Sequence, residues 1–252
     1  MTQHSLQGRT EKEILWFQRR DTLKAAAAWV AMGGFGAAAA QQRSNIVQLT
    51  GDALLNGQRL DPQQTILTGD QIQTGPGASL IFVIGNASFQ VRQNSMLTVE
   101  RGSSINTVSL LRLLTGAVAS VWGKGSNRTI VMPTLTAGIR GTGVYSEVLA
   151  DQGGRNYFCN CYGTVDMKSG GDTTVSQAQY HQSFWADPSA ARGARLSPAN
   201  AINHTDEELE FLAGLIEQRT AWQIAGKKGI KDGRGYMEAP PAQQRQPETP
   251  AR

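Results

Sequence analysis

Residues 132–167 read MPTLTAGIRGTGVYSEVLADQGGRNYFCNCYGTVDM, and the rest of the chain is organised around this stretch. It holds Arg140 between glycines, then a strand pattern, and then Cys159 and Cys161, the only two cysteines of the chain. Before it, short apolar runs alternate with turn residues at a spacing of roughly 8–12 residues, which is typical of an all-β domain. The stretch therefore predicts strands, with its reactive side chains carried on a β-rich body.

The composition supports this prediction. The 252 residues include 28 glycines, and only 17% are charged, against roughly 25% in an average soluble domain. Val, Ile and Thr alternate with Gly, Asn and Ser, a pattern that favours strands and turns over helices. We therefore expect an all-β fold, a sandwich, a roll or a solenoid-like stack of about a dozen short strands.

Individual strands follow from turn signals and apolar runs. Asn56-Gly57 suits the positive φ angles of a type I′ turn and predicts a hairpin. The run SLIFVI at 79–84 is apolar throughout and predicts a strand buried on both faces. Further strands are expected at 87–92, 96–100, 108–114, 117–122, 128–132, 143–150, 157–162 and 164–168.

The charge is spread thinly along the chain. Lys and Arg number 24 against 20 Asp and Glu, and residues 1–40 hold five of the former and three of the latter, so the remainder carries 19 against 17. Binding to nucleic acid depends on clustered cationic side chains. No such cluster is visible, so nucleic acid is not an expected partner.

The N-terminus has the features of an export signal. Arg19-Arg20, followed by Leu23 and Lys24, resembles a twin-arginine signal, and an uncharged stretch of 16 residues follows at 25–40. As a helix that stretch would span only about 24 Å, less than a bilayer core of about 30 Å. We expect cleavage before Gln41 and a periplasmic or secreted protein; an uncleaved segment would instead tether the chain to a membrane.

Between residues 45 and 168 the order of turn and strand signals resembles the FecR domain, a family of bacterial envelope proteins. Each signal is unspecific by itself, and the resemblance rests on their joint order. The signals are Gly51-Asp52, Asn56-Gly57, Gly69-Asp70, Ile72, Thr74-Gly75, Ala78-Ser79, Asn94-Ser95, Leu114, Gly116, Val118, Pro133-Thr134, Ala137 and Ile139-Arg140-Gly141-Thr142. Gly143 departs from the pattern, since many members carry an acidic residue there.

The resemblance implies a role in envelope signalling or iron-uptake regulation. The founding member of the family couples an outer-membrane iron transporter to a cytoplasmic sigma factor, through a cytoplasmic domain and a membrane span. Residues 1–18 are too few for such a domain. We therefore expect a stand-alone exported module that binds a small ligand or an envelope protein; a membrane-tethered signalling component is the alternative.

Arg140 and Thr142 are candidate ligand-binding residues. An arginine held among glycines could pair with a carboxylate through both arms of its guanidinium. The alternative is a structural arginine, paired with an acidic side chain in a turn that positions strands. The family resemblance favours this structural interpretation of 138–142.

Cys159 and Cys161 are candidate metal ligands. Alternate residues of a strand point to the same face, so both thiols would lie side by side. With His181 and His204, the two histidines beyond the export signal, they would form a Cys2His2 set for zinc or copper. The alternatives are a strained disulfide or two inert buried thiols.

The C-terminal part is expected to close the domain. Thr205 and Glu208 have the spacing of a capping box, and an apolar stripe follows to about Trp222, which predicts one amphipathic helix. The expected organisation is an export signal at 1–40, the FecR-like β domain at 41–185, a closing segment with the helix at 186–226, and a disordered tail at 227–252.

Enzyme signatures are missing from the sequence. It contains no GxSxG and no HExxH motif, and its carboxylates show no paired pattern. We therefore expect a non-catalytic binding module, with metal binding or metal sensing at the cysteines and histidines as the alternative function.

Overall fold

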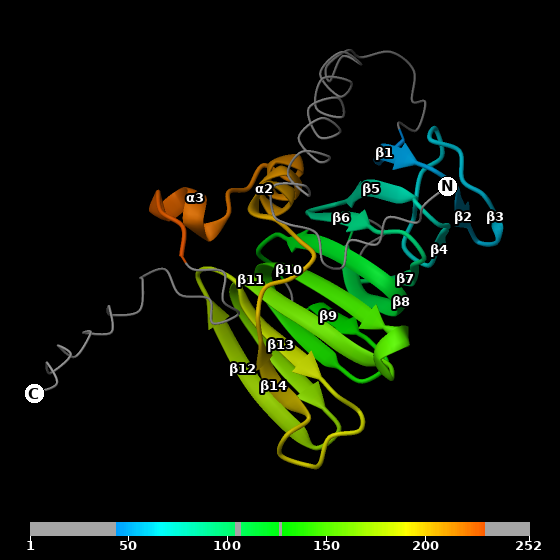
Figure 1. The fold of residues 1–252 in the computed structure, drawn as a ribbon. Coiled ribbons are helices and arrows are strands. Elements are labelled where there is room, and N and C mark those ends of the chain that lie inside the picture. The colour runs from blue at the N-terminus through cyan, green and yellow to red at the C-terminus, as the bar shows by residue number, and fades with distance from the viewer. Residues whose placement is uncertain (1–43, 104–106, 126–127, 230–252) are drawn as a thin grey trace, which may run out of the picture.

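The computed structural model describes residues 44–103, 107–125 and 128–229, and the predicted export signal and nearly all of the predicted tail lie outside them. The described residues form an all-β fold, as predicted, with α-helices only near its C-terminal end (Figure 1). The strands are β1 (Ile46–Thr50), β2 (Ala53–Leu55), β3 (Gln58–Arg59), β4 (Gln71–Thr74), β5 (Ser79–Ile84), β6 (Ala87–Val91), β7 (Met96–Arg101), β8 (Val108–Trp122), β9 (Arg128–Val131), β10 (Thr136–Leu149), β11 (Arg155–Ser169), β12 (Asp172–Ala178), β13 (Gln182–Ala186) and β14 (Leu196–Ala199). A 3-10 helix (Ala150–Gln152) follows β10, and the α-helices are α2 (Asp206–Leu215) and α3 (Ala221–Ala225).

Two local predictions are confirmed. Asn56 and Gly57 connect β2 to β3 with φ angles of 53° and 80°, as a type I′ hairpin requires. The run at 79–84 forms β5, with Leu80 and Phe82 buried on one face and Ile81 on the other. A continuous apolar run is thus a strand covered on both sides.

The long strands differ from the prediction. We expected breaks near Gly116 and Gly163, and a turn at 138–142, but β8, β10 and β11 run through all three places without ending. Gly116, Gly141 and Gly163 have φ angles of 74°, 61° and 102°, and the strand registers shift beside each of them. These glycines therefore form bulges, which bend a strand without terminating it.

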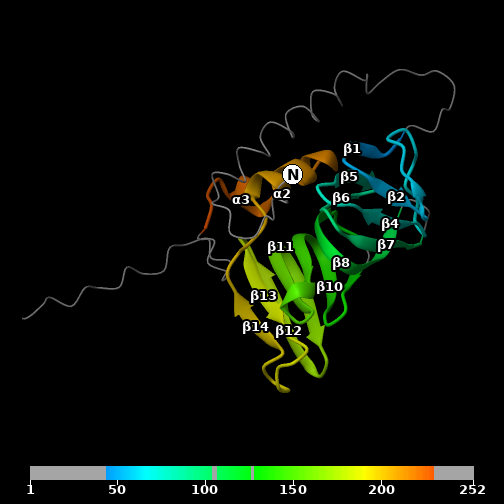
Figure 2. The same cartoon turned by 45° about the vertical axis from the view of Figure 1, so that its right-hand side comes forward.

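Each bend exchanges the neighbours of a strand. β10 pairs with β9 through Thr136–Ile139 and with β8 through Gly143–Val148. β11 pairs with β13 before its bend and with β12 after it. Because the three long strands belong to both halves, one continuous ladder of fourteen strands folds over into the two layers of a sandwich (Figure 2).

The folded ladder creates two buried regions. The first, here called the inter-layer core, lies between the layers and is mainly aliphatic, with Phe82, Phe89 and Trp122 as its large aromatic members. The second, here called the helix-covered core, lies on the opposite face of β8, β10 and β11, between these strands and the two helices. Its buried members are Ile81, Ala117, Ala119, Val121, Tyr145, Tyr157, Cys159, Cys161, Tyr162, Tyr180, Ala199, Leu209, Leu212, Ala213 and Trp222.

Helix α2 begins as predicted but ends earlier. Thr205 caps it in a capping box with Glu208, and it packs against β6, β8 and β10, with Ser88 donating to the carbonyl of Leu212. The predicted extent of this helix to Trp222 is wrong. The chain turns after Leu215, and Thr220 caps the separate helix α3, which brings Trp222 back over the sheet.

Beyond residue 169 the chain also forms strands that the sequence patterns did not predict. β12 extends one layer beside β11, and β13 and β14 extend the other (Figure 1). Among the described residues, none of the helices has the length and apolarity needed to cross a bilayer.

Candidate metal centre

The two cysteines lie in β11, directly before its bend. As alternate residues of one strand, Cys159 and Cys161 point to the same face, as predicted, and their Sγ atoms are 3.7 Å apart. Neither is in a disulfide, and both are without solvent exposure in the helix-covered core. The strand thus presents two sulfur atoms to the underside of the helices.

The two histidines reach the same point from different parts of the chain. His181 stands just before β13, with a φ angle of 29°, and His204 stands two residues before the first residue of α2. One ligand atom from each histidine and each cysteine lies within 4.8 Å of the other three, and all four residues are buried. The structure therefore brings together the four residues that the sequence analysis grouped.

Three of the six separations within this group are close to those of a tetrahedral metal cage, and all six are within 4.8 Å. Zn²⁺ binds sulfur at about 2.3 Å and imidazole nitrogen at about 2.0–2.1 Å, so tetrahedral angles imply S···S near 3.8 Å, S···N near 3.6 Å and N···N near 3.3 Å. The observed values are 3.7 Å between the sulfurs, 3.6 Å from Cys159 Sγ to His181 Nδ1, and 3.0 Å from His181 Nδ1 to His204 Nε2.

Hydrogen bonds on the far side of each ring fix which nitrogen faces the group. Asp206 Oδ1 accepts from His181 Nε2 at 2.8 Å, and the carbonyl of Ile202 accepts from His204 Nδ1 at 2.6 Å. In a neutral imidazole the other nitrogen then carries a lone pair. The facing nitrogens of His181 and His204 would thus be two acceptors in contact, an arrangement that requires a proton or a metal ion between them.

The thiol of Cys159 can supply a negative charge that balances such a proton or metal ion. Burial opposes ionisation of the Cys159 thiol, but the hydrogen bond from Cys161, the charge of His204, and hydrogen bonds from both imidazoles outweigh it and hold the pKa of Cys159 well below its ordinary value. The thiolate is the form that binds metal. The surroundings of Cys159 therefore favour its ligand form.

A second set of residues positions the imidazoles. Asp206 holds His181 and also accepts from Tyr180, and Lys228 lies 2.7 Å from its other oxygen. Sequence reasoning missed Asp206, although it occupies the first position of a helix whose start was predicted correctly. Contact between that position and His181 depends on the packing of α2, which sequence spacing does not reveal.

Aromatic rings enclose the group from two sides. Tyr145 stacks on His204 with a centroid separation of 4.7 Å and an interplanar angle of 14°, and Trp222 stacks on His181 at 5.2 Å and 27°. Both aromatic side chains are almost fully buried. The rings restrict the orientation of the imidazoles and keep bulk water away from them.

Cys159, His181 and Asp206 also have the order of a thiol–imidazole–carboxylate triad. Such a triad activates a sulfur nucleophile only where a substrate can reach it. Cys159 and His181 have no solvent exposure, and the helices cover them. The geometry thus favours a bound ion over a substrate.

The other candidate residues lie elsewhere. Arg140 sits at the bend of β10, is 62% exposed, and pairs with Asp166 on β11 at 2.7 Å. The hydroxyl of Thr142 is buried without a hydrogen-bond partner among the described residues. Arg140 is thus paired with an acidic side chain, as the structural interpretation predicted. The pair lies in a bulged strand and not in a turn.

Comparison with known proteins found no match in sequence and two partial structural matches. No family model and no curated protein matches the chain. Two crystal structures of a "putative anti-sigma factor" from Parabacteroides distasonis are similar, both with a TM-score of 0.42 and with sequence identities of 6% and 8%. They cover 48% and 50% of this chain, which in turn spans 57% and 58% of their length, somewhat more than half.

Proposed function

We propose that this protein is an exported, non-catalytic binding module of the FecR type that holds one zinc ion between Cys159, Cys161, His181 and His204. The observation that carries the proposal is the pair of facing imidazole nitrogens, 3.0 Å apart, whose opposite nitrogens both donate to protein oxygens. A cation between them would remove the repulsion of two lone pairs. The two adjacent sulfurs supply the remaining ligands.

The donor set favours zinc over other metals. Two thiolates and two imidazoles in a tetrahedral arrangement are a common structural zinc site, in which the protein fills every coordination position. Copper(I) also prefers thiolates and is the principal competitor. His181 would bind through Nδ1 and His204 through Nε2, and Asp206 would orient the first ring, as carboxylates do for many zinc-bound histidines.

The effect of the ion would be structural. The ligands come from β11, from the residue before β13, and from the segment leading into α2. A metal bound to all of them would fasten α2 to the sheet and so complete the helix-covered core. Loading before export would suit a twin-arginine route, which carries folded proteins.

Metal analysis of the full chain tests the proposal. Protein purified without chelators should contain about one zinc per chain, and it should take up Co²⁺ with the visible absorption of a tetrahedral thiolate site. Cys159→Ser combined with Cys161→Ser should remove both signals. The control is Tyr162→Phe, which deletes a neighbouring buried hydroxyl that has no hydrogen-bond partner among the described residues, and it should leave the zinc in place.

Three results would overturn the zinc assignment. They are the absence of stoichiometric metal, copper as the bound metal, and a chain that lacks both free thiols after denaturation because it holds a disulfide. The proposed export has its own test, because mass spectrometry of protein from intact cells should find a mature chain that starts near Gln41.

A further inference from the structure

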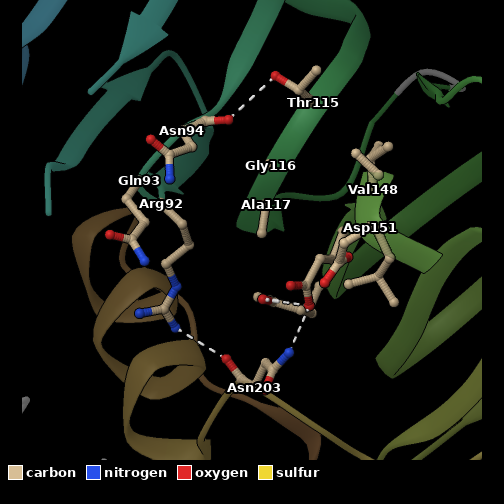
Figure 3. A pocket seen from close by; sticks show the side chains of 13 residues that line it. Arg92, Gln93, Asn94, Thr115, Gly116, Ala117, Val148, Asp151 and Asn203 are labelled. Carbon is tan, nitrogen blue, oxygen red and sulfur yellow. Dashed lines mark hydrogen bonds between the residues drawn. The ribbon is translucent and has the colours of Figure 1, made fainter. Parts of the chain in front are cut away.

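A cavity of about 320 Å³ opens beside the metal centre at the edge of the helix-covered core, whose members Ala117 and Tyr145 line part of it. Its walls come from the turn after β6, the bend of β8, the end of β10, and Asn203. Figure 3 shows Arg92 and Asn203 at one end, Asn94 and Thr115 at the other, and Asp151 on a side wall. Its volume suits a molecule of about the size of an amino acid.

The single cation of the wall is already neutralised. The guanidinium of Arg92 is buried against the carboxylate of Glu208 and also donates to the carbonyl of Asn203. Burial opposes the charge on Arg92, but Glu208 and the neighbouring acidic groups outweigh that effect and raise its pKa. Arg92 therefore offers no net positive charge to an incoming anion.

Two carboxylates remain. Glu147 Oε2 accepts hydrogen bonds from the Tyr145 hydroxyl at 3.1 Å and from Asn203 Nδ2 at 2.8 Å, both of which are neutral donors. Asp151 is exposed and has no ion pair among the described residues. With Arg92 and Glu208 cancelling, the cavity carries a net charge of about −2, which favours a cationic occupant.

One donor of the wall also lacks an acceptor. The Nε–H of Arg92 is buried without a hydrogen-bond partner among the described residues. The Nε atom has almost no solvent contact, so an oxygen atom on the occupant would reach it only if the guanidinium turned toward the cavity; this contact would remove the cost of an unpaired buried donor. The cavity is thus suited to an occupant that has positive charge near Glu147 and Asp151 and a hydrogen-bond acceptor near Arg92.

We propose that this cavity binds a small organic cation, an ammonium or guanidinium compound that also carries a carbonyl or hydroxyl oxygen. The proposal goes beyond metal binding and does not depend on it, because its charged residues are distinct from the four metal ligands. The cavity does share a wall with the centre, since Asn203 precedes His204 and Tyr145 both lines the cavity and stacks on that imidazole.

Calorimetry on the full chain with L-argininamide as the probe tests this proposal. The compound has two positive charges and an amide oxygen, whereas glutaramide and glutarate are neutral and anionic solutes of similar size. We expect saturable binding of one argininamide per chain and no saturable binding of the other two. Glu147→Gln keeps the acceptor for Tyr145 and Asn203 but removes the charge, and it should weaken binding at least about fivefold.

Glu217→Gln is the matched control. Glu217 is exposed, has no hydrogen bond or ion pair to another side chain among the described residues, and does not line the cavity, so the same chemical change there should leave the affinity unaltered. The proposal fails if argininamide does not saturate the protein, if Glu147→Gln binds as tightly as the wild type, or if glutarate binds more tightly. Circular dichroism of Glu147→Gln should match the wild type, which excludes misfolding as the cause of weaker binding.

Discussion

The inter-layer core and the helix-covered core lie on opposite faces of the same strands, yet their chemistry differs. On β11, Phe158 points into the first, whereas Tyr157 and Cys159 point into the second. The inter-layer core is built from apolar side chains that need only to fill space. The helix-covered core contains thiols and hydroxyls, and His181 and His204 are buried beside it. Burial of such groups requires specific partners.

The two cores should therefore depend on different sources of stability. The stability of the inter-layer core follows from the apolar area that it removes from water. Beside the helix-covered core, two imidazole nitrogens lie 3.0 Å apart with two thiols around them, so the stability of this core should depend on the proposed ion. Metal removal and mutation can separate these two contributions.

The largest effect is expected from loss of the proposed ion. At a free zinc concentration about 1,000 times the dissociation constant, binding stabilises the folded chain by about 4 kcal/mol. Chelation should therefore lower the thermal midpoint of the wild type and release α2, seen as faster hydrogen exchange across residues 206–215. Cys159→Ser should have the lower midpoint already and should not respond to the chelator. A wild type that ignores the chelator would contradict the prediction.

An effect of about 3 kcal/mol is expected from Leu97→Ala in the inter-layer core. Leu97 has no solvent exposure, and its truncation removes apolar contacts and leaves a cavity. Urea unfolding should show the same loss in zinc-loaded and chelated protein, because Leu97 belongs to the inter-layer core. A loss that depended on zinc would show that the two cores are not independent.

The sequence predicted the strands and the candidate metal centre to different extents. The alternation and turn signals identified the hairpin at Asn56-Gly57, the run at 79–84 and the capping box at Thr205, because each depends on neighbouring residues. The same signals divided β8, β10 and β11 at their glycines. A glycine with positive φ can either end a strand or bulge it, and the choice depends on whether partner strands continue on both sides.

The metal candidates could be grouped because the chain offers so few of them. Beyond the export signal the sequence has only two cysteines and two histidines, so these four residues could be grouped by their ligand chemistry without any spacing motif. Asp206 could not be found in this way, because acidic residues are numerous and its contact with His181 is made by tertiary packing. The cavity beside Asn203 was hidden for the same reason, since its walls come from four separate segments.

A smaller effect, on metal affinity, is expected from Asp206→Asn. Loss of the carboxylate should weaken zinc binding about 10- to 100-fold, because His181 would lose the charged acceptor that orients it. Competition with a chromophoric chelator measures this affinity. Glu207→Gln is the matched control, since Glu207 lies next in the helix and also faces Lys228, and it should change the affinity little. Equal affinities in the two variants would remove Asp206 from its positioning role.

The smallest effect is expected from Arg140→Ala. The side chains of Arg140 and its partner Asp166 are 62% and 43% exposed, and solvent-exposed ion pairs contribute about 0–1 kcal/mol to the free energy of unfolding. Urea unfolding should therefore show a loss within this range, with zinc content unchanged, because the pair lies on the solvent side of the bend and the metal ligands lie beneath the helices. A loss of several kcal/mol would mean that the bend of β10 needs this arginine. If the stability is unchanged, the bend is maintained by the backbone conformation of Gly141 and by the packing of the two cores, without a contribution from the ion pair.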